Sequence, residues 1–103
     1  MIMMKPEDVV IRQNEFLRQF ETEIKDHLIA IEYSDNERNM FLSKVKFKVD
    51  IHDEDMINLF IKAVLDDLKE KEITVVPTSA YVKKFIKRNK LIYKKMLPVG
   101  MAI

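Results

Sequence analysis

One stretch of the chain constrains the fold most, because it contains a strand, a break and a helix in succession. It runs from Thr74 to Tyr93 and reads TVVPTSAYVKKFIKRNKLIY. The β-branched run Thr74 to Val76 stiffens an extended backbone. Pro77 lacks the N–H that would continue a sheet ladder, so the strand is expected to end there. The hydroxyl of Ser79 can then cap a helix by accepting a backbone N–H of its first turn.

The helix that follows is predicted to bury one face, because apolar residues recur at helical spacing: Tyr81, Val82, Phe85 and Ile86. Residues 78 to 103 contain seven basic residues and no acid, whereas residues 1 to 77 carry a net charge of −6. Four of these lysines recur three or four residues apart and predict a positive stripe: Lys83, Lys87, Lys90 and Lys94. Such a stripe is typical of a solvated face or of a surface that contacts phosphates. Nucleic acid is the less favoured partner, because no aromatic residues are interleaved with the lysines.

Three alternating segments in the first half predict an antiparallel meander. The first strand starts at Arg18 and places Phe20, Thr22 and Ile24 on one side. The second covers residues 28 to 33, and a polar turn leads into the third, residues 40 to 49. In the third strand one face is apolar (Phe41, Val45, Phe47 and Val49), and the opposite face carries lysines and should be wet.

A helix is predicted from Asp53, its N-cap, to about Lys71. Its apolar residues form a broad stripe that should pack on a sheet: Ile57, Phe60, Ile61, Val64, Leu65 and Leu68. The fold class is therefore α+β, an antiparallel strand meander followed by helix, strand and helix.

The chain has 103 residues, enough for one domain, which we place at residues 18 to 97. Residues 1 to 17 form an N-terminal extension without an assigned structure, and residues 98 to 103 form a tail. No apolar run is long enough for a membrane span, no signal peptide is recognisable, and cysteine is absent, so a soluble cytoplasmic protein without disulfides is expected. Apolar Met and Ile at both ends are compatible with a homodimer formed through an edge strand or tail.

The strand and helix at the end of the chain resemble those of the small, single-domain, YjdJ-type branch of the GNAT acetyltransferases. The matching residues follow one another in order: Pro77, Tyr81, Val82, Phe85, Ile86, Arg88, Asn89 and Tyr93. The resemblance covers roughly residues 18 to 95, weakly in the middle. It implies a GNAT-like fold and transfer of acetyl from acetyl-CoA to a small amine or a protein amine.

The resemblance also implies site residues. Glu32 would be a general base on a strand that lines the acceptor side, Tyr93 a general acid for the leaving thiolate, and Ser79 occupies the place of a cysteine in that branch. Cofactor contacts would come from Val49, Ser79, Lys83, Lys87 and Arg88. Each residue also has a structural interpretation. Ser79 fits an N-cap, Glu32 an ordinary exposed strand residue, and the lysines a solvated face, while Tyr81, a second candidate acid, fits the core better.

The pyrophosphate-binding loop of the family needs glycines, which allow the backbone to approach phosphate. The corresponding segment here, residues 49 to 57, has no glycine and four acids, and Gly100 is the only glycine of the chain. This departure argues against acetyl-CoA binding in the usual mode. It leaves open a second hypothesis, an inactive GNAT-fold interaction module, and a third, a small phosphate binder. His52 beside Asp53 and Asp55 fits a helix cap, so no metal site is expected.

Overall fold

The computed structural model describes residues 8–24, 26–36, 39–47 and 54–101. Within these ranges a five-stranded sheet follows chain order, β1 (Arg12–Asn14), β2 (Gln19–Ile24), β3 (His27–Asn36), β4 (Asn39–Lys46) and β5 (Thr74–Pro77). Neighbouring strands are antiparallel except β4 and β5, which are parallel. The helices are α1 (Glu54–Glu70), α2 (Ala80–Arg88) and α3 (Lys90–Tyr93), followed by a 3-10 turn, η2 (Lys94–Met96). The predicted α+β order of meander, helix, strand and helix is confirmed.

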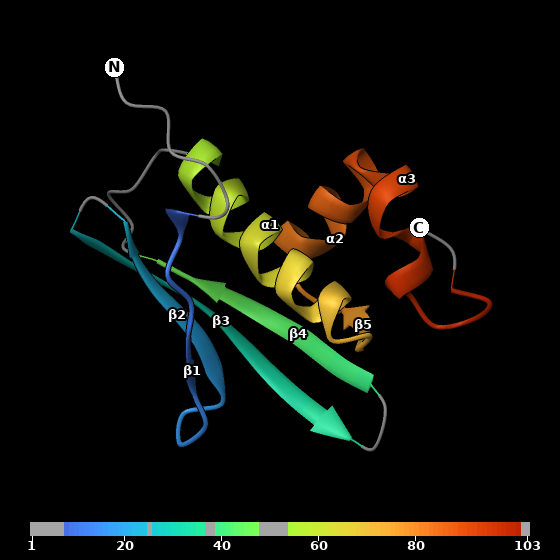
Figure 1. The fold of residues 1–103 in the computed structure, drawn as a ribbon, viewed down its shortest axis with the longest axis horizontal. Helices are drawn as coiled ribbons and strands as arrows, with labels where there is room; N and C mark the ends of the chain where they lie inside the picture. Colours follow the sequence, from blue (N-terminus) through green and yellow to red (C-terminus); the bar gives the residue numbers. More distant parts are fainter. Residues whose placement is uncertain (1–7, 25, 37–38, 48–53, 102–103) are drawn as a thin grey trace.

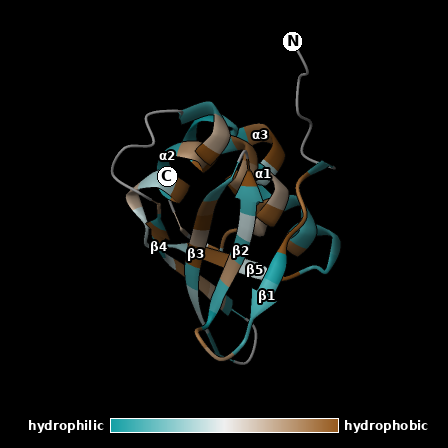
Figure 2. Cartoon of the chain, turned by 90° about the vertical axis from the view of Figure 1, so that its left-hand side faces the viewer, coloured by the Kyte–Doolittle hydropathy of each residue, from teal (hydrophilic) through white to brown (hydrophobic). Residues whose placement is uncertain are grey.

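The molecule has two layers, because α1, α2 and α3 all lie on one face of the sheet (Figure 1). Figure 2 shows the same arrangement from the side, with the hydrophilic strand β1 at the sheet edge. The inner sheet face, which packs against the helices, supplies Phe20, Ile29, Ile31 and Leu42 to the core. The outer face is not covered by any described helix. None of the described helices is both long and apolar enough to cross a bilayer.

Helix α1 supplies the other half of the core. Its predicted apolar stripe is confirmed, since every residue of it is buried, together with Met56 and Ala63. Glu54 and Asp55 lie in its first turn, where negative charge interacts favourably with the helix dipole. The predicted cap, Asp53, lies outside the described residues.

Strand β4 contains a bulge that the sequence pattern did not reveal. Glu32 of β3 faces Lys44, but its neighbour Tyr33 faces Leu42, so Ser43 is the extra residue on β4. The bulge reverses the alternation of side chains. Leu42 and Met40 are therefore buried on the inner face, and Phe41, which we predicted on the same face as Val45, lies on the outer face. That part of the prediction was wrong, whereas Val45 and Phe47 do pack against the core.

The segment before Arg18, left without a structure by the sequence, contributes a strand to the sheet. Asn14 ends β1, and its side-chain oxygen accepts the backbone N–H of Leu17 at 3.0 Å, which closes the turn into β2. Arg18 leaves this turn with a φ of +50°. The buried hydroxyl of Thr22 donates to the carbonyl of Val10 at 2.8 Å, so the chain before β1 is also attached to the sheet.

The predicted helix at the end of the chain is interrupted at Asn89. Its φ of −121° and ψ of +39° leave the helical region, and its side-chain amide donates to the carbonyl of Phe85 at 2.9 Å. The axis therefore changes between α2 and α3. The lysines that we expected to form one stripe are divided between two helical segments: Lys83 and Lys87 on the first, Lys90 and Lys94 on the second and the turn after it.

Two leucines provide a matched test of this core. Leu42 is 0% exposed and Leu91 is 101% exposed. We expect Leu42→Ala to lower the free energy of unfolding by about 2–5 kcal/mol, through lost burial and a new cavity. Leu91→Ala should change it by less than about 0.5 kcal/mol. Urea denaturation of both variants checks this, and equal effects would contradict the placement of β4.

Candidate functional site

Strands β4 and β5 separate near the middle of the sheet. Their parallel pairing ends where Leu42 lies opposite Pro77. The carbonyl of Leu42 then accepts the backbone N–H groups of Thr78 and Ser79, at 3.0 and 2.9 Å, and the chain turns into α2. Among the described strands, none pairs with β4 beyond this point on the β5 side, so the backbone edge from Ser43 onward faces α2.

Ser79 lies at this separation and is buried. Its hydroxyl oxygen accepts the N–H of Val82 at 3.5 Å, so the predicted N-cap is confirmed. No described side chain that could act as a base hydrogen-bonds to Ser79. Its catalytic role therefore remains a prediction, while its capping role is visible.

A small cleft of about 30 Å³ lies between the start of α1 and the side of α2. It is lined by Glu54, Asn58, Tyr81, Lys84, Phe85 and Arg88. Lys84 and Arg88 are four residues apart and so project from the same side of α2. Both are cations without an ion pair to a described residue, whereas Glu54 brings one negative charge from the opposite wall.

Only some of the predicted cofactor residues line the cleft. Arg88 lines it, but Lys83 and Lys87 do not. Each of these lysines directly precedes a lining residue, and neighbouring residues of a helix point about 100° apart. Val49 lies outside the described residues. Lys84 was not among the predicted site residues, although its spacing to Arg88 could have identified it.

Tyr81 is also placed differently from our expectation. We predicted that it would pack in the core, but it is 40% exposed and lies at the cleft. Its ring meets that of Phe47, at the end of β4, in an edge-to-face contact with the centroids 5.5 Å apart. The Tyr81 ring therefore connects α2 with the residue that follows β4.

Tyr93 is fully buried, and its hydroxyl joins α3 to α1. It donates to Asp66 Oδ1 at 2.8 Å and accepts from Lys62 Nζ at 3.0 Å, while Lys62 and Asp66 form an ion pair at 3.4 Å. Burial raises the pKa of Tyr93, partly opposed by Lys62, and the hydrogen bond from Lys62 to Tyr93 raises the pKa of that lysine. The hydroxyl proton of Tyr93 is therefore held in the hydrogen bond to Asp66. Its role as a general acid remains a prediction.

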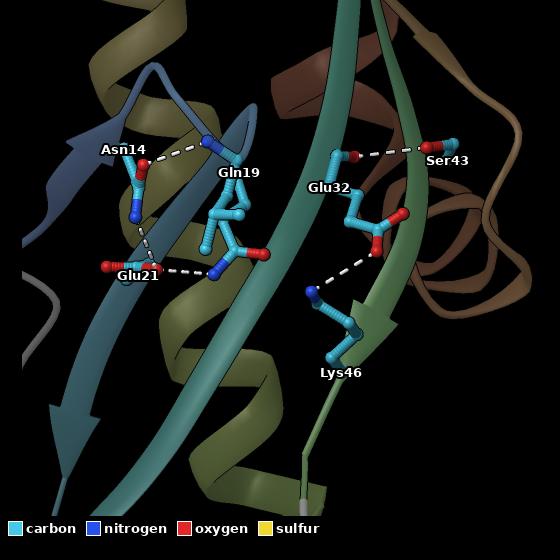
Figure 3. Close-up of polar contacts among 7 residues, drawn as sticks. Asn14, Gln19, Glu21, Glu32, Ser43 and Lys46 are labelled. Carbon is cyan, nitrogen blue, oxygen red and sulfur yellow. Dashed lines mark hydrogen bonds and ion pairs between the residues drawn. The ribbon is translucent and has the colours of Figure 1, made fainter.

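Glu32 lies on the outer face of the sheet, beside the bulge. Its carboxylate pairs with Lys46 at 3.2 Å, and its backbone carbonyl accepts the hydroxyl of Ser43 at 3.3 Å (Figure 3). Glu32 and Ser79 thus lie on opposite sides of β4, next to Ser43 and Leu42. Within the described ranges, no three His, Cys, Asp or Glu side chains are grouped to hold a metal ion. His52 and Asp53 lie outside these ranges.

The Tyr93 contacts can be tested by substitution. Tyr93→Phe should lower the free energy of unfolding by about 1 kcal/mol at pH 7, the usual worth of a hydrogen bond. Tyr81→Phe is the matched control, because the Tyr81 hydroxyl bonds to no described residue, and it should change little.

The stability difference between the native chain and Tyr93→Phe should also depend on pH. Because the pKa of Tyr93 is higher in the folded chain than in the unfolded one, its contribution is complete below about pH 10 and is lost as the pH rises through the folded pKa. The stability difference between the native chain and Tyr93→Phe should therefore shrink in alkali. A difference that grows in alkali would contradict these contacts.

Comparison with known proteins agrees with this geometry. A family model described as GCN5-related N-acetyl-transferase matches residues 19–96, well over half of the chain. No curated protein matches the sequence. The matched region starts at β2 and ends at η2, so it includes the separation of β4 and β5 and both walls of the cleft. The chain therefore belongs to the GCN5-related N-acetyltransferase family.

Proposed function

We propose that this protein binds acetyl-CoA at the cleft between α1 and α2 and transfers the acetyl group to an amine. The observation that carries the proposal is the cleft itself, which Lys84 and Arg88 line together, opposite the start of α1. An ammonium and a guanidinium side by side suit a pyrophosphate, since each donates charge-assisted hydrogen bonds. These two residues would replace the missing glycine-rich loop.

The other parts of the site follow from the same arrangement. The unpaired backbone of β4 from Ser43 onward offers main-chain hydrogen bonds to an extended ligand arm. When bound, acetyl-CoA supplies the activated acetyl group. Glu32, next to the bulge, is the proposed acceptor for the proton that the attacking amine must lose. Ser79 positions α2 by capping it, whatever further role it has.

We further propose that the chain belongs to the YjdJ-type branch. The matching residues from Pro77 to Tyr93 support this assignment, and Ser79 in place of the usual cysteine is the departure from it. If acetyl transfer occurs here, it therefore uses direct attack of the amine on the thioester, with no cysteine to carry the acetyl group.

A second candidate is a GNAT-fold interaction module without activity. Two observations favour it. Glu54 lines the cleft, where its charge opposes a phosphate, and Glu54 and Asp55 occupy the helix end at which an anion would bind. The two candidates differ in whether acetyl-CoA binds at all.

Isothermal titration of the full chain with acetyl-CoA and with CoA distinguishes them. We expect a dissociation constant of about 100 μM or tighter, which corresponds to about 5.5 kcal/mol. Lys84→Ala/Arg88→Ala should weaken binding at least about tenfold. Lys83→Ala/Lys87→Ala is the matched control, since it removes the same charge from the same helix outside the cleft, and it should weaken binding much less.

Each contrary result has a separate meaning. No heat at millimolar ligand would overturn acetyl-CoA binding and leave the interaction module. Equal weakening by the two double variants would keep binding but reject the cleft, because only the total charge of α2 would matter. Binding without acetylation of any amine would support an inactive relative that retains the cofactor.

Glu54 gives an independent prediction. Glu54→Gln removes the negative charge of the cleft and should tighten CoA binding about fivefold, as expected for about 1 kcal/mol of repulsion near the surface. Asp55→Gln is the control, because Asp55 is in the same helical turn but does not line the cleft. Unchanged affinity in Glu54→Gln would show that the phosphates bind elsewhere.

A further inference from the structure

The helical segment from Lys90 to Met96, formed by α3 and η2, has one buried side and one exposed side. Tyr93 and Met96 are three residues apart and both are buried, so they form the side that packs in the core. Leu91 is 101% exposed, and Ile92 is also exposed. The outer side of this segment therefore presents two large aliphatic side chains to the solvent.

Lysines are interleaved with these aliphatic side chains. Lys94 and Lys95 are exposed and follow Leu91 by three and four residues, so they lie about one helical turn away on the same side. Lys90, which is exposed as well, begins the segment. Among the described residues, no ion pair involves any of the seven cations that follow Pro77. These charges are therefore available to an anionic partner.

A tight turn after this segment exposes one more aliphatic side chain. The backbone N–H of Met101 donates to the carbonyl of Pro98 at 3.1 Å, and Gly100 has a φ of +86°, which suits the third position of such a turn. Val99 occupies the second position, at the tip, and is 107% exposed. Figure 1 places α3, η2 and this turn together at one end of the molecule, away from the β1–β2 turn.

We propose that this end of the molecule binds the surface of an anionic lipid bilayer. The C-terminal surface, as we call it, consists of Lys90, Leu91, Ile92, Lys94, Lys95 and Val99. The aliphatic side chains would insert among the lipid headgroups, and the lysines would contact lipid phosphates. Exposed aliphatic side chains bordered by lysines are typical of segments that lie in the bilayer interface, where apolar burial and charge attraction act together.

Other anionic partners fit the C-terminal surface less well. Nucleic acid would satisfy the lysines but leave three aliphatic side chains in water, and the surface has no aromatic side chain to stack on a base. A folded acidic protein would need a complementary recess, because Leu91 and Val99 project from convex parts of the molecule. A bilayer interface is fluid and accommodates such side chains without a preformed shape. The proposal goes beyond acetyl transfer and does not depend on it, because neither CoA nor the α1–α2 cleft takes part.

The first experiment is co-sedimentation of the full chain, without CoA, with vesicles of phosphatidylcholine alone or with about one-third phosphatidylserine. We expect the chain to bind the phosphatidylserine vesicles at least about tenfold more tightly. Raising the salt concentration from about 0.1 M to about 1 M should weaken that binding, because salt screens the lysines. Equal binding to the two kinds of vesicle, or no binding to either, would overturn the proposal.

Two apolar double variants locate the contact. Leu91→Ala/Val99→Ala should weaken binding to phosphatidylserine vesicles at least about tenfold, because apolar burial is lost. Phe16→Ala/Leu17→Ala is the matched control, since it removes two exposed apolar side chains at the β1–β2 turn, and it should leave binding unchanged. Equal losses in the two variants would show unspecific adsorption and overturn the proposal.

Two basic double variants test the charge in the same way. Lys94→Ala/Lys95→Ala should weaken binding about tenfold, because lysines near an anionic bilayer are attracted to it. Arg12→Ala/Lys44→Ala removes the same charge from exposed positions on the outer face of the sheet and should weaken binding much less. Equal losses would mean that only net charge matters and would reject this surface.

Tryptophan fluorescence reports insertion directly, because the sequence contains no tryptophan. Leu91→Trp places a single indole on the C-terminal surface, and Phe16→Trp places one at the β1–β2 turn. The emission of Leu91→Trp should shift to shorter wavelength on phosphatidylserine vesicles, since indole favours the bilayer interface, whereas that of Phe16→Trp should not. An unshifted Leu91→Trp that still sediments with the vesicles would overturn insertion.

A double-stranded oligonucleotide and polyglutamate are the competing probes. We expect both to bind more weakly than phosphatidylserine vesicles, and neither should respond to Leu91→Ala/Val99→Ala. Tighter binding to the oligonucleotide would overturn the proposal in favour of a nucleic-acid surface. Tighter binding to polyglutamate would overturn it in favour of an acidic protein partner.

Discussion

The carbonyl oxygen of Leu42 is the point on which the rest of the structure depends. Pro77 has no N–H to continue the β4–β5 ladder, and the next two N–H groups, of Thr78 and Ser79, converge on this one oxygen. The chain therefore leaves the sheet and enters α2 within two residues. This local exchange of hydrogen bonds sets the angle of α2, exposes the edge of β4 and positions the wall that carries Lys84 and Arg88.

Much of the fold could be predicted from local patterns. The alternation in β2, the stripe of α1, Pro77 at the end of β5 and the cap at Ser79 each depend on residues close in sequence, and each is confirmed. The bulge at Ser43 could not be predicted this way, because it arises from pairing with β3. The break at Asn89 could not be predicted either, because one asparagine among good helix formers does not disturb the helical spacing of the apolar residues.

The candidate site was less accessible to sequence reasoning. Periodicity identified the basic side of α2 but not its orientation relative to α1, so Lys83 and Lys87 were favoured over Lys84. Tyr81 fitted the helical period of the core, but its edge-to-face contact with Phe47 required the end of β4 to be nearby.

The link between Tyr93, Lys62 and Asp66 also has a mechanical consequence. Helix α2 is fixed at its start by the carbonyl of Leu42 and beyond its end by Tyr93, which ties the following turn to the middle of α1. Because both of its ends are held, α2 forms a fixed wall of the cleft. The opposite wall, the first turn of α1, exposes Glu54 and Asp55 but buries Met56 and Ile57 in the core. Both walls of the cleft are therefore anchored, α2 by hydrogen bonds and α1 by packing, so the core sets the width of the cleft.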